Sequence, residues 1–372
     1  MVVKTYKYKL YKTKRVKHLH RLINISGVIY NHCIALQKRY YKLYGISLNK
    51  FQLQKHLTKL KKLAKYSYWK KLGSQAIQNI TERIDKGYKK FFKKQGGLPT
   101  FKKIKKYKSF TLKGKVGYKI NGNVISLNGY NYKFWLSKAI DGKIKTVTLK
   151  RDNIGDFYIC ISIEIAEKIN ITTGKSVGID FGLKQFLTLS DKTKVDAPLF
   201  HLKNLSKLKK LNRNLSKKKK GSNSRKKAKK QLAKLHIKIA NQRKDYFHKL
   251  ANKLTFKYDD IFIEDLNIKA MQILWGRKIS DLAFSEFITI LSYKTNIHKI
   301  DRFYPSSKTC SKCGEINSDI NSDFKKLNDR VFSCKCGLEI DRDLNASINI
   351  YRVGTSTLRG ESVRAKSLAY SC

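Results

Sequence analysis

Three acidic residues and four cysteines follow one another in the second half of the chain, in an order that few folds can use. Asp180 lies in the segment V-G-I-D-F-G, Glu264 in I-F-I-E-D-L and Asp343 in D-R-D-L-N-A-S. The first two acids each end a short apolar run that is typical of a buried strand. Between the second and third acids stand two cysteine pairs: Cys310 with Cys313, and Cys334 with Cys336. This order predicts a fold that gathers distant acids at one place and carries a sulfur-ligated module between them.

Acids at the ends of neighbouring strands are suited to bind a pair of divalent cations. Two Mg²⁺ about 3.5–4 Å apart can activate a water and neutralise the leaving oxygen in phosphodiester cleavage. In such a site Asp180 would bridge both ions, while Glu264 and Asp343 would each hold one. We expect Gly178 and Gly182 to keep the surroundings of Asp180 open to a phosphate backbone. The three acids therefore predict a metal-dependent nuclease that uses two Mg²⁺.

Each acid also has a structural interpretation. An aspartate that follows a strand is commonly a turn residue, and strand alternation does not choose between Glu264 and the adjacent Asp265. Either Asp341 or Asp343 could be the N-cap of the helix that follows, where a carboxylate lies near the positive end of the helix dipole. The joint order of the three acids, with the cysteine module before the third, favours catalysis.

The four cysteines have the spacing of a zinc module. They lie in C-S-K-C-G and C-K-C-G, with twenty residues between Cys313 and Cys334. Four thiolates bind one Zn²⁺ tetrahedrally and leave no open position, so we expect the zinc to be structural. Such spacing is typical of a reducing compartment. Of the other cysteines, we expect Cys33 and Cys160 to be buried thiols and Cys372 to lie in the tail.

The charge of the chain predicts a polyanionic partner. The formal net charge is +56, and no acid occurs between Met1 and Thr81 or between Ala197 and Lys244. A compact protein with this balance repels itself unless a polyanion is bound, so we expect RNA or DNA. The alternatives for the basic runs are a solvated surface or, in a eukaryotic host, a nuclear address. The expected backbone contacts are Lys217, Lys218, Lys219, Lys220, Arg225, Lys226 and Lys227.

The first half of the chain has a strand pattern, then a helical pattern, then strands again. Residues 1–13 alternate as a strand does, and residues 14–94 have helical spacing. Residues 96–99, G-G-L-P, interrupt the helical pattern. Hairpins follow at 123–136, around Asn128-Gly129, and at 143–166. We expect the first strand to join these later strands, which makes the helical block an insertion in a β-barrel.

Two sets of side chains in the helical block were assigned to the core. An apolar stripe at helical spacing runs over Ala76, Ile77, Ile80, Ile84, Tyr88 and Phe91. Aromatic residues also alternate with lysines, and we expect most of these to be core and a minority to stack on unpaired bases. They are Tyr40, Tyr41, Tyr44, Tyr66, Tyr68 and Trp69.

The second half predicts short buried strands separated by helices. The expected strands are 177–180, 185–190, 260–264 and 300–303, and the expected helices are 199–215, 225–254, 282–299 and 341–351. The N-terminus has no secretory signal, and no apolar run approaches the ~20 residues of a membrane span. We therefore expect a cytoplasmic protein without membrane contact, associated with the nucleoid in a prokaryotic host.

At these motifs the sequence resembles the TnpB family of transposon-encoded, RNA-guided DNA endonucleases, which are related to type V CRISPR effectors. The resemblance covers about residues 1–352. It is carried by T-Y-K-Y-K-L-Y, L-P-T-F-K-K, G-I-D-F-G-L-K-Q-F-L-T-L-S-D, I-E-D-L-N-I-K, D-R-F-Y-P-S-S-K-T-C-S-K-C-G and C-G-L-E-I-D-R-D-L-N-A-S-I-N-I. It implies that Asp180, Glu264 and Asp343 are catalytic, with a guide RNA from the element end and double-stranded target DNA beside a short adjacent motif as partners.

The resemblance also implies an α+β multidomain fold. This is an RNase H-like (RuvC) nuclease core with an inserted zinc ribbon, after an N-terminal wedge-type β-barrel that carries a helical recognition insertion. The implied parts are the first barrel strand (1–13), the recognition insertion (14–97), the rest of the barrel (98–170), the first nuclease part (171–303), the zinc ribbon (304–340), the second nuclease part (341–353) and a loose C-terminal tail (354–372).

One departure from the family pattern bears on activity. Only residues 295–300 stand where the family has a longer stretch that ends in a strand, so a core strand could be shortened. The alternative function is therefore an RNA-guided DNA binder or repressor that does not cut. A transposase that moves the element itself would need a nucleophilic tyrosine near paired histidines. His18 and His20 come nearest, and we expect them to be surface or RNA contacts.

Overall fold

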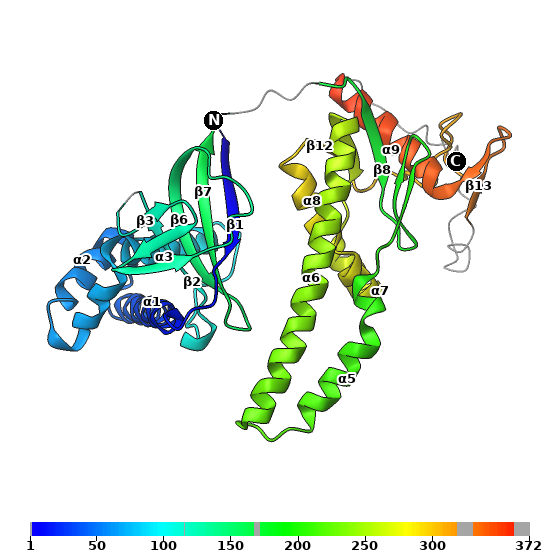
Figure 1. Ribbon diagram of the computed structural model, residues 1–372. Coiled ribbons are helices and arrows are strands. Elements are labelled where there is room, and N and C mark those ends of the chain that lie inside the picture. Colours follow the sequence, from blue (N-terminus) through cyan, green and yellow to red (C-terminus); the bar gives the residue numbers. More distant parts are fainter. Residues whose placement is uncertain (1, 115, 167–171, 318–329, 361–372) are drawn as a thin grey trace. The chain divides into compact units, whose positions relative to one another are not determined.

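The computed structural model describes residues 2–114, 116–166, 172–317 and 330–360, without the side chains of residues 275 and 277. The chain divides into two compact units, residues 1–169 and 170–372, which Figure 1 shows coloured along the sequence. Cys372 and the far end of the predicted tail lie outside the described residues. Within these residues, no helix is long and apolar enough to cross a membrane.

The first unit contains two antiparallel sheets. Strand β1 (Val2–Lys9) pairs along its length with β7 (Phe157–Ile165), so the first strand does join the later ones. A bridge between Leu10 and Phe134 follows β1 and connects it to the second sheet. The four-stranded sheet has the order β1-β7-β6-β2, with β6 (Lys143–Arg151) and β2 (Ser109–Lys113); the three-stranded sheet comprises β3 (Lys119–Asn121), β4 (Val124–Leu127) and β5 (Tyr130–Lys133).

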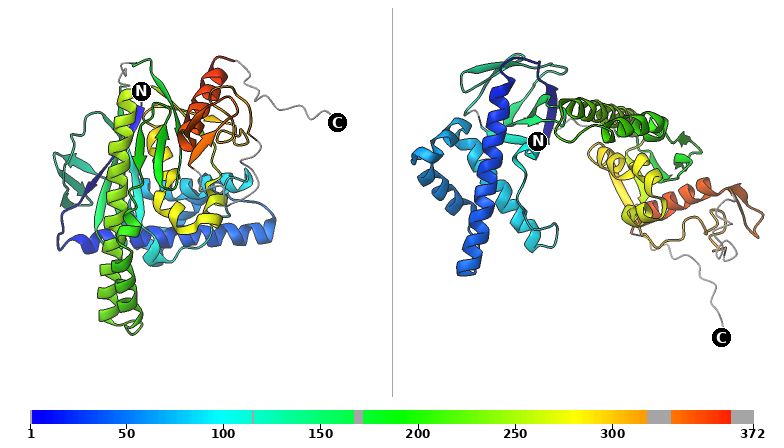
Figure 2. Two further views of the ribbon diagram at one scale, coloured as in Figure 1. Left: turned by 90° about the vertical axis from the view of Figure 1, so that its right-hand side faces the viewer. Right: turned by 90° about the horizontal axis from the view of Figure 1, so that it is seen from below.

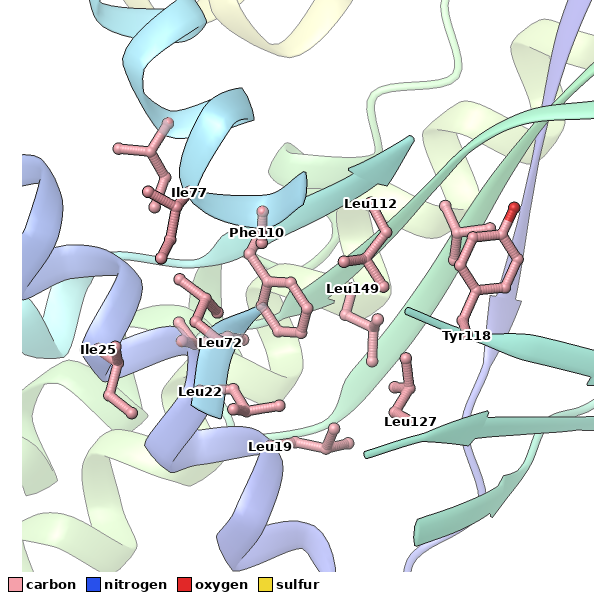
Figure 3. Packing of buried hydrophobic residues seen from close by; sticks show 14 of the residues in the cluster. Leu19, Leu22, Ile25, Leu72, Ile77, Phe110, Leu112, Tyr118, Leu127 and Leu149 are labelled. Atoms are coloured by element: carbon pink, nitrogen blue, oxygen red, sulfur yellow. The ribbon is translucent and has the colours of Figure 1, made fainter. Parts of the chain in front are cut away.

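The helices of the first unit are inserted between β1 and β2. They are α1 (Val16–Tyr44), α2 (Lys50–Leu60), the 3₁₀ segment η1 (Ala64–Leu72), α3 (Ser74–Phe92) and the short η2 (Ile104–Lys106). Buried side chains of α1 and α3 pack against the four-stranded sheet in one apolar cluster. Figure 3 shows this packing, with Leu19, Leu22, Ile77, Phe110 and Leu149 among the labelled side chains.

Several core predictions for this unit were wrong. Of the six aromatic residues interleaved with lysines, only Trp69 is buried; Tyr41, Tyr44 and Tyr68 are exposed, because they lie on the helix faces that point away from the sheet. Phe91, at the end of the α3 stripe, is also exposed because the helix ends one residue later.

Two other predictions for small groups also need correction. His18 and His20 are half-buried and pack against Tyr132 and Phe157, so they belong to the sheet–helix packing more than to a free surface. Cys33 is buried as predicted, whereas Cys160 is only half-buried because it lies in a strand whose side chains alternate between the core and the outer face.

The second unit is built on one mixed five-stranded sheet with the order β10-β9-β8-β11-β12. The central strand β8 is antiparallel to β9 and parallel to β11, which in turn is parallel to β12. Parallel neighbours end at the same edge of a sheet, so β8 and β11 bring their carboxyl ends together. The strands are β8 (Ser176–Asp180), β9 (Gln185–Leu189), β10 (Lys194–Asp196), β11 (Asp260–Glu264) and β12 (Asn296–Ile300).

The predicted helix over 282–299 and strand over 300–303 were wrong. The structure has α7 (Ile268–Leu282) and α8 (Phe284–Ser292), separated by Ala283 in a left-handed conformation, and then β12. The apolar residues before Ser292 have helical spacing, but pairing with β11 draws residues 296–300 into the sheet. The short segment at 295–300 therefore keeps its strand, and no core strand is lost there.

The basic helices form a long hairpin. Short α4 (Phe200–Lys203) leads into α5 (Leu205–Ser216), and α6 (Asn223–Lys257) runs back beside it, as Figures 1 and 2 show. A small apolar cluster of Leu208, Leu235 and Ile239 holds the two helices together. The hairpin therefore has an apolar seam, and its other faces carry the basic side chains.

The last described element is a helix that packs across the sheet. After the two short strands β13 (Val331–Ser333) and β14 (Glu339–Asp341), helix α9 extends over Arg342–Leu358. The predicted loose tail from residue 354 was therefore wrong for its first residues. Gly354 of this helix lies against Phe262 of β11, where a Cβ atom would come within 2.1 Å of the ring. This glycine permits close packing and does not end the helix.

Candidate metal centres and nucleic-acid surface

Two of the three predicted acids lie side by side at one edge of the central sheet. Asp180 is the last residue of β8 and Glu264 the last residue of β11. The register pairs Ile179 with Ile263, so the two carboxylates follow at the same level of adjacent parallel strands. The three residues before each acid are buried, and both acids are half-buried at the edge.

The third acid comes from α9. Asp343 lies in the first turn of this helix, while Asp341 is its N-cap and accepts a hydrogen bond from the Leu344 N–H (3.0 Å). The structural interpretation thus applies to Asp341 and leaves Asp343 available. Helix α9 packs closely on β8 at Gly178, where a Cβ atom would be 2.3 Å from the Ser347 carbonyl oxygen. The expectation for Gly178 was therefore wrong: its missing side chain makes room for α9 and not for a phosphate.

The acids influence one another electrostatically. Burial, followed by the charges of Asp343 and Glu264, raises the pKa of Asp180 to about 7. Burial also raises the pKa of Glu264, with a smaller contribution from Asp265. A carboxylate surrounded by like charges and shielded from water favours its neutral form, and a bound cation reverses this preference. The cluster around Asp180 is therefore costly to ionise until a cation is bound.

Two of the acids at this end of the sheet, Asp265 and Asp343, form ion pairs with basic residues of the chain. Asp265, the other candidate at the end of β11, accepts from Lys299 Nζ (2.8 Å) and is bound by the Arg302 guanidinium, and these contacts lower its pKa. Asp343 accepts from Arg330 Nη1 at 2.8 Å. Glu264 therefore remains as the acid of β11 without a cationic partner among the described residues.

The three acids do not form a compact ligand cluster in the way that the cysteines do. Among the described ranges, only the four cysteines bring three or more acidic, histidine or thiol ligand atoms within 4.8 Å of one another. The acids nevertheless act on one another, because the charges of Asp343 and Glu264 add to burial in raising the pKa of Asp180. The donor set is all oxygen, which Mg²⁺ prefers.

The four cysteines have the geometry of a zinc centre. Their Sγ atoms all lie within 4.8 Å of one another, with 3.6 Å between Cys310 and Cys336 and 3.6 Å between Cys313 and Cys334. A tetrahedral Zn²⁺ with Zn–S bonds of about 2.3 Å requires Sγ atoms about 3.8 Å apart. Gly314 and Gly337, which end the two turns, have φ of 81° and 80°, and this lets the backbone fold around the sulfurs. The cysteines thus fit one tetrahedral zinc.

Two buried asparagines of α9 anchor the cysteine module, and the sequence did not reveal them. Asn345 accepts from the Ser311 N–H (2.9 Å) and donates to the Thr309 carbonyl (2.8 Å). Asn349 donates to the carbonyls of Ser306 (2.9 Å) and Thr309. The only sequence signal for this role was the position of two asparagines on the helix face that also carries Ala346, Ile350 and Val353. Through these contacts the helix that carries Asp343 also positions the cysteine turn.

The predicted nucleic-acid contacts on the hairpin separate into two groups. The side chains of Lys217, Lys218, Lys219, Lys220, Lys226 and Lys227 are exposed at or next to the hairpin tip. Arg225 is different, because its Nη1 donates to the carbonyls of Leu215 (2.9 Å) and Lys218 (2.8 Å). Arg225 therefore holds the end of α5, and the prediction of a free backbone contact needs correction there. The six exposed lysines form a surface suited to phosphate contacts.

Comparison with known families matches both parts of the second unit. Residues 159–274 match the family model described as a probable transposase, OrfB_IS605. Residues 284–350 match the Cas12f1-like TNB domain. The second match contains the four cysteines and the first two turns of α9, and the first contains Asp180 and Glu264.

Relatives and solved structures extend the similarity over nearly the whole chain. A Streptomyces pristinaespiralis protein named "Putative RNA-guided DNA endonuclease" is 29% identical and covers 98% of this chain and 92% of its own. InsQ of Escherichia coli K12, with a similar name, is 27% identical over 93% and 91%. The Cas12f1 chain of a Cas12f1–sgRNA–target DNA complex superposes with a TM-score of 0.61 at 16% identity, covering 94% of this chain and 98% of that one.

The fold and the matched models define the class as Cas12f-like α+β proteins with a TNB domain. Within this class, the chain is similar to TnpB-like proteins and to proteins named as RNA-guided DNA endonucleases. TnpB-like protein L79 of Acanthamoeba polyphaga mimivirus is a further relative, 32% identical over 59% of this chain and 45% of its own.

Proposed function

We propose that this protein is an RNA-guided DNA endonuclease. The observation that carries the proposal is the group of three acids at one sheet edge, in a chain whose formal net charge is +56. A positive chain tolerates carboxylates that repel one another only where they have a use, and binding divalent cations is the use that their chemistry fits. The names of the similar Streptomyces and Escherichia proteins support the same activity.

Asp180, Glu264 and Asp343 would hold two Mg²⁺ at the carboxyl edge of the sheet. When bound, these ions supply charge neutralisation at the scissile phosphate and an activated water. The charges of both other acids act on Asp180, which suits the bridging position. Gly182 is required by the turn between β8 and β9, since a Cβ atom there would be 2.7 Å from the Gln185 carbonyl oxygen.

The other predicted parts are proposals on the same basis. The sheet of the second unit would be the RuvC-like core, the cysteine module its zinc ribbon, and the first unit the wedge domain with its helical recognition insertion. A guide RNA from the element end would lie along the basic surfaces and pair with double-stranded DNA beside an adjacent motif. The exposed lysines of the hairpin would contact the backbone without reading sequence, so their contribution would fall with rising salt.

The test compares each proposed metal ligand with an acid close to it in sequence: Glu264 with Asp265, and Asp343 with Asp341. Glu264→Gln and Asp343→Asn should each abolish cleavage of matched DNA by the protein with its co-purifying RNA, as should Asp180→Ala, while RNA binding persists. The matched controls are Asp265→Asn, whose acid is held by Lys299 and Arg302, and Asp341→Asn, which keeps a side chain able to cap α9. Both controls should retain cleavage.

Cleavage by Asp180→Ala at the wild-type rate would refute the endonuclease. If the wild type binds RNA and matched DNA but leaves the DNA intact in Mg²⁺, the alternative of an RNA-guided binding protein or repressor holds instead. The structure weakens the reason for that alternative, because β12 is present beside β11.

A further inference from the structure

A cavity in the first unit lies apart from the acids and the cysteines. It has a volume of about 660 Å³ and lies between α1, η1 and the β4–β5 turn. One buried water takes about 30 Å³, whereas small-ligand sites have about 300–1,000 Å³. The cavity is therefore of the size of a ligand site and is larger than a packing defect.

Aromatic rings form one wall of this cavity. Tyr68 and Tyr130 are 40% and 43% exposed, so both rings have free faces. Tyr130 packs on His18 with 4.3 Å between ring centroids, and His18 Nδ1 lies 2.7 Å from the Tyr132 hydroxyl. Burial and the charges of Arg21 and Lys71 lower the pKa of His18, which favours the neutral form of its ring. These contacts fix the orientation of the Tyr130 ring before any ligand is bound.

Cations form the opposite part of the rim. Arg21, Lys70 and Lys71 line the cavity with exposed side chains, and no described residue offers any of them an ion pair. None of the described residues that line the cavity is acidic. Elsewhere in the first unit several acids are paired with lysines, as in Glu82 with Lys113 and Glu164 with Lys145. The cavity is thus a place where positive charge is left for an external anion.

The floor offers both apolar surface and a polar atom without a partner. Leu22, Ile25 and Val28 of α1 supply the apolar surface. The Asn24 Oδ1 atom is buried and has no hydrogen-bond partner among the described residues. Because that atom is covered by the surrounding protein, the floor presents its apolar surface to a ligand.

From this geometry we propose that the cavity between α1, η1 and the β4–β5 turn is a binding subsite for one unpaired nucleotide of a bound strand. The base would stack on Tyr130 and Tyr68, and the phosphates would lie against Arg21, Lys70 and Lys71. The subsite rests on the proposed function in that the strand is either the guide RNA or the target DNA. Its recognition of a nucleotide does not depend on cleavage.

The mixed lining decides between a nucleotide and other occupants. An apolar ligand would not explain three unpaired cations, and a small inorganic anion would leave the rings and the apolar floor uncovered. A nucleotide has both a flat face and a charged group. Stacking on aromatic side chains tolerates every base, as a protein that is guided by different RNA sequences requires.

The experiment removes the ring or the base in turn and looks for coupling. Full-length protein is titrated with two series of strands, each strand carrying one abasic nucleotide. One series has the sequence of the co-purified RNA, and the other has that of the displaced strand of the matched DNA. The abasic position moves along the strand from one member of a series to the next. Tyr130→Ala should weaken binding of the occupying strand by at least about fivefold, whereas Tyr130→Phe, which keeps the ring, should bind like wild type. Tyr41→Ala, an exposed aromatic on α1 outside the cavity, is the second control.

At one position the abasic substitution should cost the wild type as much as Tyr130→Ala does, and the two losses should not add in combination. Coupling seen only with the RNA or only with the DNA identifies the strand and supports the subsite either way. Additive losses at every position, or equal binding by Tyr130→Ala and wild type, overturn it. Cleavage is followed in parallel: cutting without coupling sinks the subsite alone, and coupling without cutting sinks only the endonuclease.

Discussion

The second unit contains two candidate metal centres that differ in how their ligands are assembled. The four cysteines come from two short turns and lie within 4.8 Å of one another without any ion. The three acids come from β8, β11 and α9, which are distant in sequence, and burial together with the charges of Asp343 and Glu264 raises the pKa of Asp180 to about 7. The cysteine centre is closed by local structure, whereas the acid centre is held together by the packing of the whole unit.

This difference indicates what each centre can do. Four thiolates leave zinc no free position, so that centre stabilises the fold. Carboxylates that are spread along a sheet edge leave coordination positions for water and phosphate, so that centre can take part in a reaction. The cost of the open centre is electrostatic repulsion in the absence of cations. The experiments below test whether the two centres are as different as their geometry indicates.

The largest effect is expected at the cysteine centre. Cys310→Ser should lose the zinc and unfold the module, because structural zinc contributes an apparent binding free energy of about 10–16 kcal/mol. The measurement is zinc content per chain, together with protease resistance of residues 304–340. Cys160→Ser, at a half-buried thiol of the first unit, should keep its zinc. A Cys310→Ser protein with full zinc content would show that another ligand completes the site.

The next effect concerns how the acids are brought together. Gly178→Ala should destabilise the second unit by about 3 kcal/mol, because the new Cβ would meet the Ser347 carbonyl at 2.3 Å and the Tyr351 N at 2.5 Å. Cleavage should fall as well, since α9 carries Asp343. Gly97→Ala, where a Cβ has open space, should be neutral in denaturant unfolding. Equal stability of both variants would mean that the acid centre does not depend on close β8–α9 packing.

A smaller effect, with the opposite sign, is expected for Asp180→Asn in chelator. The folded-state pKa of Asp180 is raised from 3.8 to about 7, so ionisation costs stability as pH rises above 3.8, and the full cost is present above about 7. Asp180→Asn removes this cost. It should be more stable than wild type by about 2 kcal/mol near pH 8, because one pKa unit corresponds to about 1.4 kcal/mol and solvent reduces the effect.

The same variant has two internal controls. The difference in thermal unfolding between Asp180→Asn and wild type should vanish below about pH 3, where Asp180 is largely neutral in both the folded and the unfolded chain. Added Mg²⁺ should raise the melting temperature of the wild type and not that of the variant. A constant difference at every pH would show that Asp180 acts through packing and not through its charge.

The sequence predicted the cysteine centre better than the acid centre, because the cysteines are brought together by local turns and the acids by distant parts of the chain. The zinc ligands could be predicted from spacing, because each turn encloses its own two cysteines. Glu264 and Asp265 could not be separated by strand alternation; the separation comes from Lys299 and Arg302, which bind only Asp265. Strand β12 was assigned to a helix because its pairing with β11 is not local. Gly178 was misinterpreted because its close neighbours, Ser347 and Tyr351, come from a distant part of the chain.

The smallest effect tests whether the two centres are independent. Arg330, next to β13 of the cysteine module, donates to Asp343, and its side chain is 40% exposed. Arg330→Gln alone should therefore cost less than about 1 kcal/mol. It also removes a positive charge from the acid centre, so the stability gained by Asp180→Asn in chelator should increase in the Arg330→Gln background. Unfolding of the two single variants and the double variant gives the coupling free energy, which we expect to be about 0.5–1 kcal/mol. Strict additivity would mean that the cysteine module only supports α9, and that its arginine does not offset the repulsion among the acids.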